Sequence, residues 1–221
     1  MARQARVTLA DTPHHISQRG NRGEAVFFER ADFEQYRALM AEQCRLHHIG
    51  IWAYCLMPNQ IHLISRPAKA ENLARAVGEA HRRYTRYIND KMNWRGHLFQ
   101  DRFYSYAMDE GAVTDAAHFI ETMPAMAGIS PKPVNYLWSS ARAHLRGAED
   151  PLLSPQRPMM ELVADWEGFL AMPMPGKIMD EIATHLQTGR PRGGNEFLDM
   201  AEEALGRRVR ALPVGRPRKA A

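Results

Sequence analysis

Hydrophobic residues follow two different periods within the first 128 residues. Strand patterns mark four stretches. Residues 14–20 alternate between apolar and polar positions, 51–56 are apolar throughout as in a buried strand, and 61–65 and 100–108 are the other two. Helical spacing of apolar residues marks residues 30–48, 70–90 and 109–124. In chain order this gives β-α-β-β-α-β and one further helix. The pattern predicts an α+β fold with a ferredoxin-like βαββαβ core and an antiparallel sheet.

The chain changes character after Gly128. Prolines divide the next stretch into short apolar pieces, at Pro131, Pro133, Pro151, Pro155, Pro158, Pro173 and Pro175. Such punctuation is typical of short helices and turns, which we expect at residues 141–146, 164–172, 177–187 and 195–205. The sequence therefore predicts a core domain at 1–128, a helical C-terminal extension at 129–206 and a basic tail at 207–221.

The composition is that of a folded protein. Of the 221 residues, 45% are hydrophobic and 24% are charged, which argues against global disorder. Two cysteines cannot build a disulfide framework and fit a reducing compartment. We see no signal peptide and no apolar run long enough for a membrane span, so we expect no membrane partner and a cytoplasmic, nucleoid-associated location if DNA is bound.

Positive charge gathers at the C-terminus. The last fifteen residues carry six Arg and Lys residues and no acid, within a net formal charge of +4. Basic tails commonly bind nucleic acid, although a solvated tail is the alternative. The sequence GRPRK at 215–219 resembles an AT-hook, in which Arg216, Arg218 and Lys219 would contact a narrow A·T minor groove.

A candidate site lies in the strand-turn-strand stretch 51–65. Because strand residues alternate between faces, Gln60 and His62 share one side, next to the turn at Pro58-Asn59. Two polar groups in this position can hold a metal ion or an oxyanion. A basic surface is expected on the polar face of helix 70–90 and near the sheet end, formed by Arg82, Arg83, Arg86, Arg19 and Arg102. Tyr84 and Tyr87 fall on the apolar side, which favours the core over base stacking.

Four motifs carry a family resemblance: WAYCLMPNQIHLI at 52–64, GEAHRRY at 78–84, WRGHLFQDRF at 94–103 and WSSARAHL at 138–145. Together they resemble the REP-associated tyrosine transposases, small insertion-sequence transposases of the HUH superfamily. The resemblance implies a DNA partner, single-stranded or hairpin, and metal-assisted phosphoryl transfer. In this family two histidines on the central strand and a polar residue on the third helix hold Mg²⁺ or Mn²⁺, and a tyrosine on that helix attacks the phosphate.

This chain departs from the family at each of these positions except one. Phe119 stands where the resemblance places the nucleophilic tyrosine, and a benzyl ring has no oxygen for attack. Met123 stands in place of the metal-binding Asn, and a thioether does not suit Mg²⁺. Gln60 replaces the first histidine, so His62 remains from the expected ligands. We interpret the chain as a DNA-binding transposase relative that no longer cleaves and rejoins DNA, with metal binding weak or absent.

Two alternatives stay open. The first is an active, metal-dependent transposase that uses a displaced nucleophile, Tyr104 or Tyr106, of which one is expected to face the active side. The second is a protein-interaction remnant that has lost DNA binding. The sequence does not distinguish a monomer from a dimer. The adjacent pairs His14-His15 and His47-His48 are interpreted as surface or core residues, because neighbouring side chains point apart.

Overall fold

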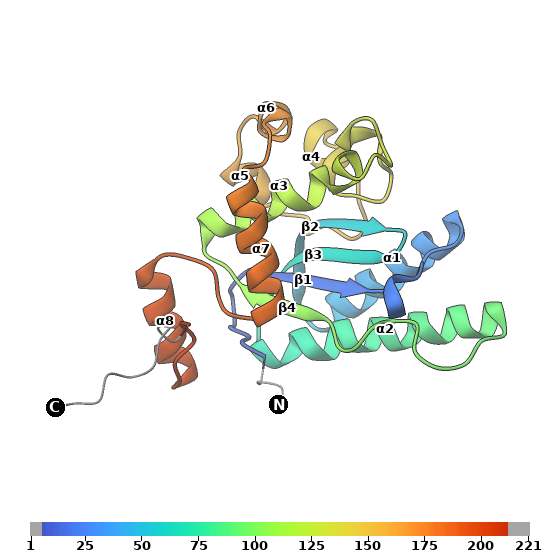
Figure 1. Cartoon of the computed structure of the whole chain (residues 1–221), viewed down its shortest axis with the longest axis horizontal. Helices are drawn as coiled ribbons and strands as arrows, with labels where there is room; N and C mark the ends of the chain where they lie inside the picture. The colour runs from blue at the N-terminus through green and yellow to red at the C-terminus, as the bar shows by residue number, and fades with distance from the viewer. Residues whose placement is uncertain (1–5, 212–221) are drawn as a thin grey trace.

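The computed structural model describes residues 6–211, which contain a four-stranded sheet with the order β2-β3-β1-β4 (Figure 1). The strands are β1 His14–Arg19, β2 Ile49–Met57, β3 Gln60–Pro67 and β4 Tyr104–Ala107. Each neighbouring pair is antiparallel. Helices α1 Arg30–Leu46, α2 Ala70–Met92 and α3 Glu110–Met126 complete the order β-α-β-β-α-β-α. The predicted α+β, ferredoxin-like fold is therefore confirmed.

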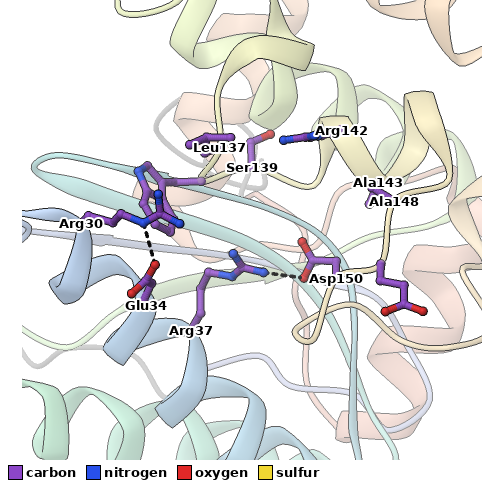
Figure 2. A pocket seen from close by; sticks show the side chains of 11 residues that line it. Arg30, Glu34, Arg37, Leu137, Ser139, Arg142, Ala143, Ala148 and Asp150 are labelled. Carbon is purple, nitrogen blue, oxygen red and sulfur yellow. Dashed lines mark hydrogen bonds and ion pairs between the residues drawn. The ribbon is translucent and has the colours of Figure 1, made fainter.

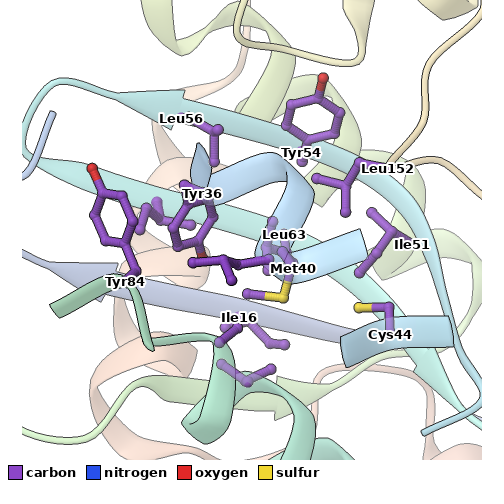
Figure 3. Close-up of a cluster of buried hydrophobic side chains, with 14 of the residues drawn as sticks. Ile16, Tyr36, Met40, Cys44, Ile51, Tyr54, Leu56, Leu63, Tyr84 and Leu152 are labelled. Atoms are coloured by element: carbon purple, nitrogen blue, oxygen red, sulfur yellow. The ribbon is translucent and has the colours of Figure 1, made fainter. Parts of the chain in front are cut away.

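Helices cover both faces of the sheet, so its strands are buried on both sides. One face packs against α1 and α2 in a cluster that includes Ile16, Tyr36, Met40, Leu63 and Tyr84 (Figure 3). The other face packs against α3 and parts of the extension. Tyr84 is fully buried, as predicted, and its hydroxyl donates to the carbonyl oxygen of Val26.

Local capping sets where these helices begin and end. At the start of α1, the Glu29 and Asp32 side chains and backbone amides form a reciprocal capping box. Asp109 caps α3 by accepting from the amide of Ala112, and Asn93 ends α2 in the left-handed conformation. The predicted strand 100–108 is shorter in the structure, since Asp101 has φ +55 and regular pairing begins at Tyr104.

The extension consists of short helices that contact both edges of the sheet. They are α4 Ala141–Arg146, α5 Met159–Leu162, α6 Trp166–Ala171, α7 Gly176–Thr188 and α8 Asn195–Leu205, with a 3-10 turn at Pro133–Asn135; a second 3-10 turn, Asn21–Gly23, lies in the core between β1 and α1. Trp138 accepts from the amide of Leu56 on β2, and Arg192 donates its amide to Ala107 on β4. These contacts satisfy backbone groups that an open edge would expose. The boundary at residue 128 stays a prediction.

A buried carboxylate joins the extension to α3. Glu121 is fully buried and accepts from the Ser140 hydroxyl, from His144 Nδ1 at 2.6 Å and from Trp166 Nε1 at 2.7 Å. These three donors come from the start of α4, from α4 itself and from α6. The carboxylate therefore fixes α4 and α6 over the face of the sheet that carries the candidate site.

Candidate functional site

His62 lies on the central strand β3 and is almost completely buried, with 2% of its surface exposed. Ser17 stands opposite it on β1, and His15 lies two residues earlier on the same face. His15 Nε2 and His62 Nδ1 are hydrogen-bonded at 2.9 Å, and His15 Nδ1 and the Tyr106 hydroxyl at 3.1 Å. Polar side chains from three strands are therefore connected by hydrogen bonds in the order Tyr106, His15, His62.

Phe119 lies beside these histidines. Its ring centroid is 5.8 Å from that of His62 and 6.3 Å from that of His15, both in edge-on arrangements. The structure thus brings together His62 and the position at which the sequence places the missing nucleophile. An aromatic edge against two imidazoles adds packing contacts and no hydroxyl.

The other two expected ligand positions differ in their surroundings. Met123 is buried in the apolar cluster between α3 and the sheet, together with Cys55 and Met57. Gln60 is half-buried at the start of β3, opposite Arg19 on β1. Gln60 and His62 share a face, as the alternation predicted.

The prediction that only one of Tyr104 and Tyr106 faces the active side is wrong. Residues two apart on a strand share a face, and the register pairs Tyr104 with Ser17 and Tyr106 with His15. Tyr106 is fully buried, and burial is the main cause that raises the pKa of its hydroxyl. Tyr104 is half-buried. A phenol without solvent access is a poor nucleophile for a DNA phosphate.

Burial also keeps the histidine pair neutral. Desolvation, followed by the nearby Arg19 guanidinium, lowers the pKa of His62 from 6.5 to about 3. Desolvation, followed by the neighbouring His62, lowers the pKa of His15 well below its ordinary value. Neutral imidazoles can share a proton in a hydrogen bond without electrostatic repulsion, which explains how two histidines are tolerated in contact.

These residues do not fit Mg²⁺ or Mn²⁺. Both ions prefer oxygen ligands, whereas His62 offers an imidazole that is already hydrogen-bonded to His15, and Met123 offers a thioether. The remaining ligand position, Gln60, offers a neutral amide oxygen in place of a histidine. In the part of the chain that the structure describes, no group of three or more His, Cys, Asp and Glu residues is arranged to hold a metal ion.

The predicted basic surface is only partly assembled. Arg82 and Arg102 line the same open pocket. Arg19 lies on the other face of the sheet, near His62. Arg83 points elsewhere and forms an ion pair with Glu42 on α1 at 2.7 Å. Arg86 is exposed on α2. Arg216, Arg218 and Lys219 lie outside the described residues.

A second pocket lies on the side of α1 and is lined by none of the predicted site residues (Figure 2). It has a volume of about 320 Å³ between α1 and the segment 137–150. Arg37 on α1 faces Asp150 at 3.3 Å, and the same carboxylate accepts from the Tyr54 hydroxyl at 2.6 Å. Its arginines are balanced by acidic residues, so it lacks a clear charge preference.

The sequence matches the family model for IS200-like transposases over residues 12–123. This match covers half of the chain and includes every strand of the sheet and most of α3. The chain belongs to the IS200-like transposase family. The resemblance inferred from the motifs is thereby confirmed.

One solved structure shows the same fold. A REP-associated tyrosine transposase bound to a REP hairpin aligns with a TM-score of 0.57 and 16% identity, over 71% of this chain and 93% of that one. A candidate transposase from Deinococcus radiodurans R1 aligns at 15% identity over 54% of this chain and 96% of that one, with a TM-score of 0.39, too low to bear on the fold. No curated protein matches this sequence. Within residues 6–211, no helix has the length and apolar character to span a membrane.

Two features of this transposase-family site were missed at the level of sequence. His15 was interpreted only as a surface or core residue, although it contacts both His62 and Tyr106. Its position on the same side as Ser17 follows from alternation, and the ferredoxin-like strand order places β1 beside β3. The second feature, the Glu121 contact with α4 and α6, has no local signal because its partners lie 19 to 45 residues further along.

Proposed function

We propose that this IS200-like transposase relative binds single-stranded or hairpin DNA and no longer cleaves and rejoins it. The observation that carries the proposal is Phe119, whose ring fills the place beside His62. DNA cleavage by a tyrosine needs a hydroxyl at that place and charge stabilisation at the scissile phosphate. Phe119 supplies no hydroxyl at that place, and the nearby Arg19 guanidinium supplies positive charge without a metal ion or an adjacent nucleophile.

The DNA-binding half of the proposal is supported by the α2 surface. Arg82 and Arg102 line one pocket, and Arg86 lies one helical turn after Arg82. Arg19 is not part of this surface, because it lies on the same face of the sheet as His62. Arginines at this density are typical of phosphate contacts. The similar REP-associated transposase is bound to a hairpin, which makes hairpin DNA the appropriate probe.

The finer assignments belong to the same proposal. Residues 1–128 would form the DNA-binding core, 129–206 a supporting extension, and 207–221 a basic tail that contacts A·T-rich minor grooves. Arg82 and Arg83 each form an ion pair with a glutamate, Glu79 and Glu42 respectively, so a phosphate would compete with that carboxylate for either guanidinium. A protein of this function would act at chromosomal DNA in the cytoplasm.

A search for a covalent protein–DNA adduct tests the loss of cleavage. The protein is incubated with labelled hairpin DNA and Mg²⁺ or Mn²⁺ and resolved on a denaturing gel, beside the triple variant Gln60→His, Phe119→Tyr, Met123→Asn. We expect no adduct from the natural protein. An adduct from the triple variant would show that these three positions are sufficient to account for the loss of DNA cleavage. An adduct from the natural protein would overturn the proposal and point to another tyrosine.

DNA binding is tested separately by titration at several salt concentrations. If arginines contact phosphates, the logarithm of the affinity should fall linearly with the logarithm of the salt concentration. Binding that is absent or insensitive to salt would favour the protein-interaction alternative.

A further inference from the structure

A glycine in the middle of α2 has no packing role. Gly78 lies well inside the helix, and a Cβ built there would meet no atom within 4 Å. Glycine at an interior helix position is less favourable than alanine. A glycine at position 78 is therefore expected only if the empty space beside it serves a function, such as binding a ligand. Gly78 also opens the motif GEAHRRY, whose role the proposed function leaves unexplained.

The space beside Gly78 is an open pocket of about 390 Å³, between α2 and the segment 97–103. Its volume falls within the range of roughly 300–1,000 Å³ that is typical of small-molecule sites. On the α2 side the pocket is lined by the small residues Ala74 and Gly78. On the side of segment 97–103 it is lined by Phe99 and Phe103.

One of the side chains that line the pocket, Gln18, carries an acceptor without a partner. Gln18 lines the pocket and is 1% exposed, and its Nε2 donates to the carbonyl oxygens of Gln100 and Asp101, both at 3.3 Å. Its Oε1 is buried and has no hydrogen-bond partner. A buried acceptor of this kind is costly unless a ligand or a water donates to it.

The charges at the pocket favour an anionic ligand. Three arginines line it, Arg6, Arg82 and Arg102, against one acidic residue, Asp101. The Arg6 guanidinium stacks on the Phe103 ring at 3.7 Å from its centroid, and Arg82 shares its charge with Glu79 on the exposed side of α2. A ligand that fits must combine a negative group, a flat apolar body and a hydrogen-bond donor.

We propose that this pocket binds one unpaired nucleotide from the single-stranded flank of a bound DNA hairpin. Its base lies against the aromatic wall and donates an N–H to Gln18 Oε1, and its phosphate lies near Arg82 and Arg102. This inference rests on the DNA binding proposed above and assigns it a nucleotide subsite. The subsite lies on the α2 side of β1, on the opposite face from His62.

The test compares two hairpins that carry the same short single-stranded flank, one with bases and one with abasic sugars. Both retain all phosphates, so the difference in affinity reports the bases. The variant Gly78→Leu fills the pocket without disfavouring the helix. Gly176→Leu is the matched control, since Gly176 begins α7, does not line the pocket, and would likewise place a Cβ with no atom within 4 Å.

We expect the natural protein and Gly176→Leu to bind the flank with bases about tenfold or more tightly than the abasic flank. Gly78→Leu should lose that preference and keep the affinity for the abasic hairpin. Equal affinity of the natural protein for both hairpins, or an unchanged preference in Gly78→Leu, would overturn the nucleotide subsite and leave DNA binding intact. Failure to bind either hairpin would overturn the proposed function as well.

Discussion

Replacement of Glu121 by glutamine should destabilise the protein although it changes a single atom. In the natural protein, Oε1 accepts from Ser140 and His144 and Oε2 accepts from Trp166 Nε1. A carboxamide has one oxygen, so its NH₂ group must face at least one of these donors. The least costly orientation directs it toward Trp166 and leaves two N–H groups opposed in a fully buried site.

The magnitude follows from the number of donors left without an acceptor. One buried unsatisfied polar group costs about 1–3 kcal/mol, so Glu121→Gln should lower the free energy of unfolding by that amount. Glu121→Ala leaves three donors unsatisfied and a cavity behind, and should cost about 3–5 kcal/mol. Either loss is a large share of the roughly 5–15 kcal/mol that stabilises a domain.

Urea unfolding measures these changes from the midpoint at constant slope. Glu110→Gln, at the exposed start of α3, is the control and should stay within about 0.5 kcal/mol of the natural protein. Trp166→Phe removes the opposed N–H, so the double variant with Glu121→Gln should be less destabilised than the sum of the singles by about 1 kcal/mol. Additive effects, or a Glu121→Gln variant as stable as the control, would show that the carboxylate does not hold α4 and α6 in place.

Three further predictions concern two buried histidines, the exposed Arg86 and the carboxylate of Asp150. Burial is the main cause that lowers the pKa of His14 to about 4 and of His81 to about 3, from 6.5, so the folded state resists protonation and each histidine should withdraw about 1.4 kcal/mol of stability per pH unit as the pH falls below 6.5. Unfolding free energies that are flat between neutral pH and about pH 5 would contradict this. Arg86→Gln should reduce the slope of log affinity against log salt by about 1 for every DNA sequence, and an unchanged slope would remove it from the phosphate contacts. Asp150→Ala should cost about 2–4 kcal/mol in urea unfolding, because it leaves the buried Tyr54 hydroxyl and the facing guanidinium unpaired, and a loss below about 0.5 kcal/mol would contradict that.

Periodicity was sufficient to predict the core helices, because each of them buries one face against the sheet. The stripe of Leu73, Ala76, Val77 and Ala80 predicts α2, and all four side chains are buried in the cluster with α1. Element ends were less predictable where the backbone conformation depends on distant partners. The predicted strand 100–108 included residues 100–103, yet Asp101 has a positive φ, and Gln100 forms hydrogen bonds with Gln18 and Arg19 in place of regular pairing. The single-turn α5 has too few residues for a period and was not predicted.

Side chains that meet across strands could be predicted only in part. The alternation placed Gln60 and His62 on one face, and the same rule, correctly applied, places Tyr104 and Tyr106 together. The contact between His15 and His62 depends on the register of β1 against β3, which neither strand encodes alone. Burial of the pair, and with it the lowered pKa of both imidazoles, depends on α3 and the extension, which are distant in sequence.

The three departures from the family pattern depend on one another physically. Once Phe119 replaces a tyrosine, the site needs no metal to neutralise charge at a phosphate, and a polar ligand at position 123 would be a buried group without a partner. Met123 instead packs with Cys55 and Met57, and the hydrogen bond to His15 satisfies the remaining histidine. Restoring Phe119→Tyr alone would add a hydroxyl beside neutral imidazoles, with the Arg19 guanidinium nearby but no set of metal ligands to position the phosphate. The proposed function therefore requires that adduct formation return only when Gln60, Phe119 and Met123 are changed together, and an adduct from the Phe119→Tyr single variant would show that the metal ligands were never lost.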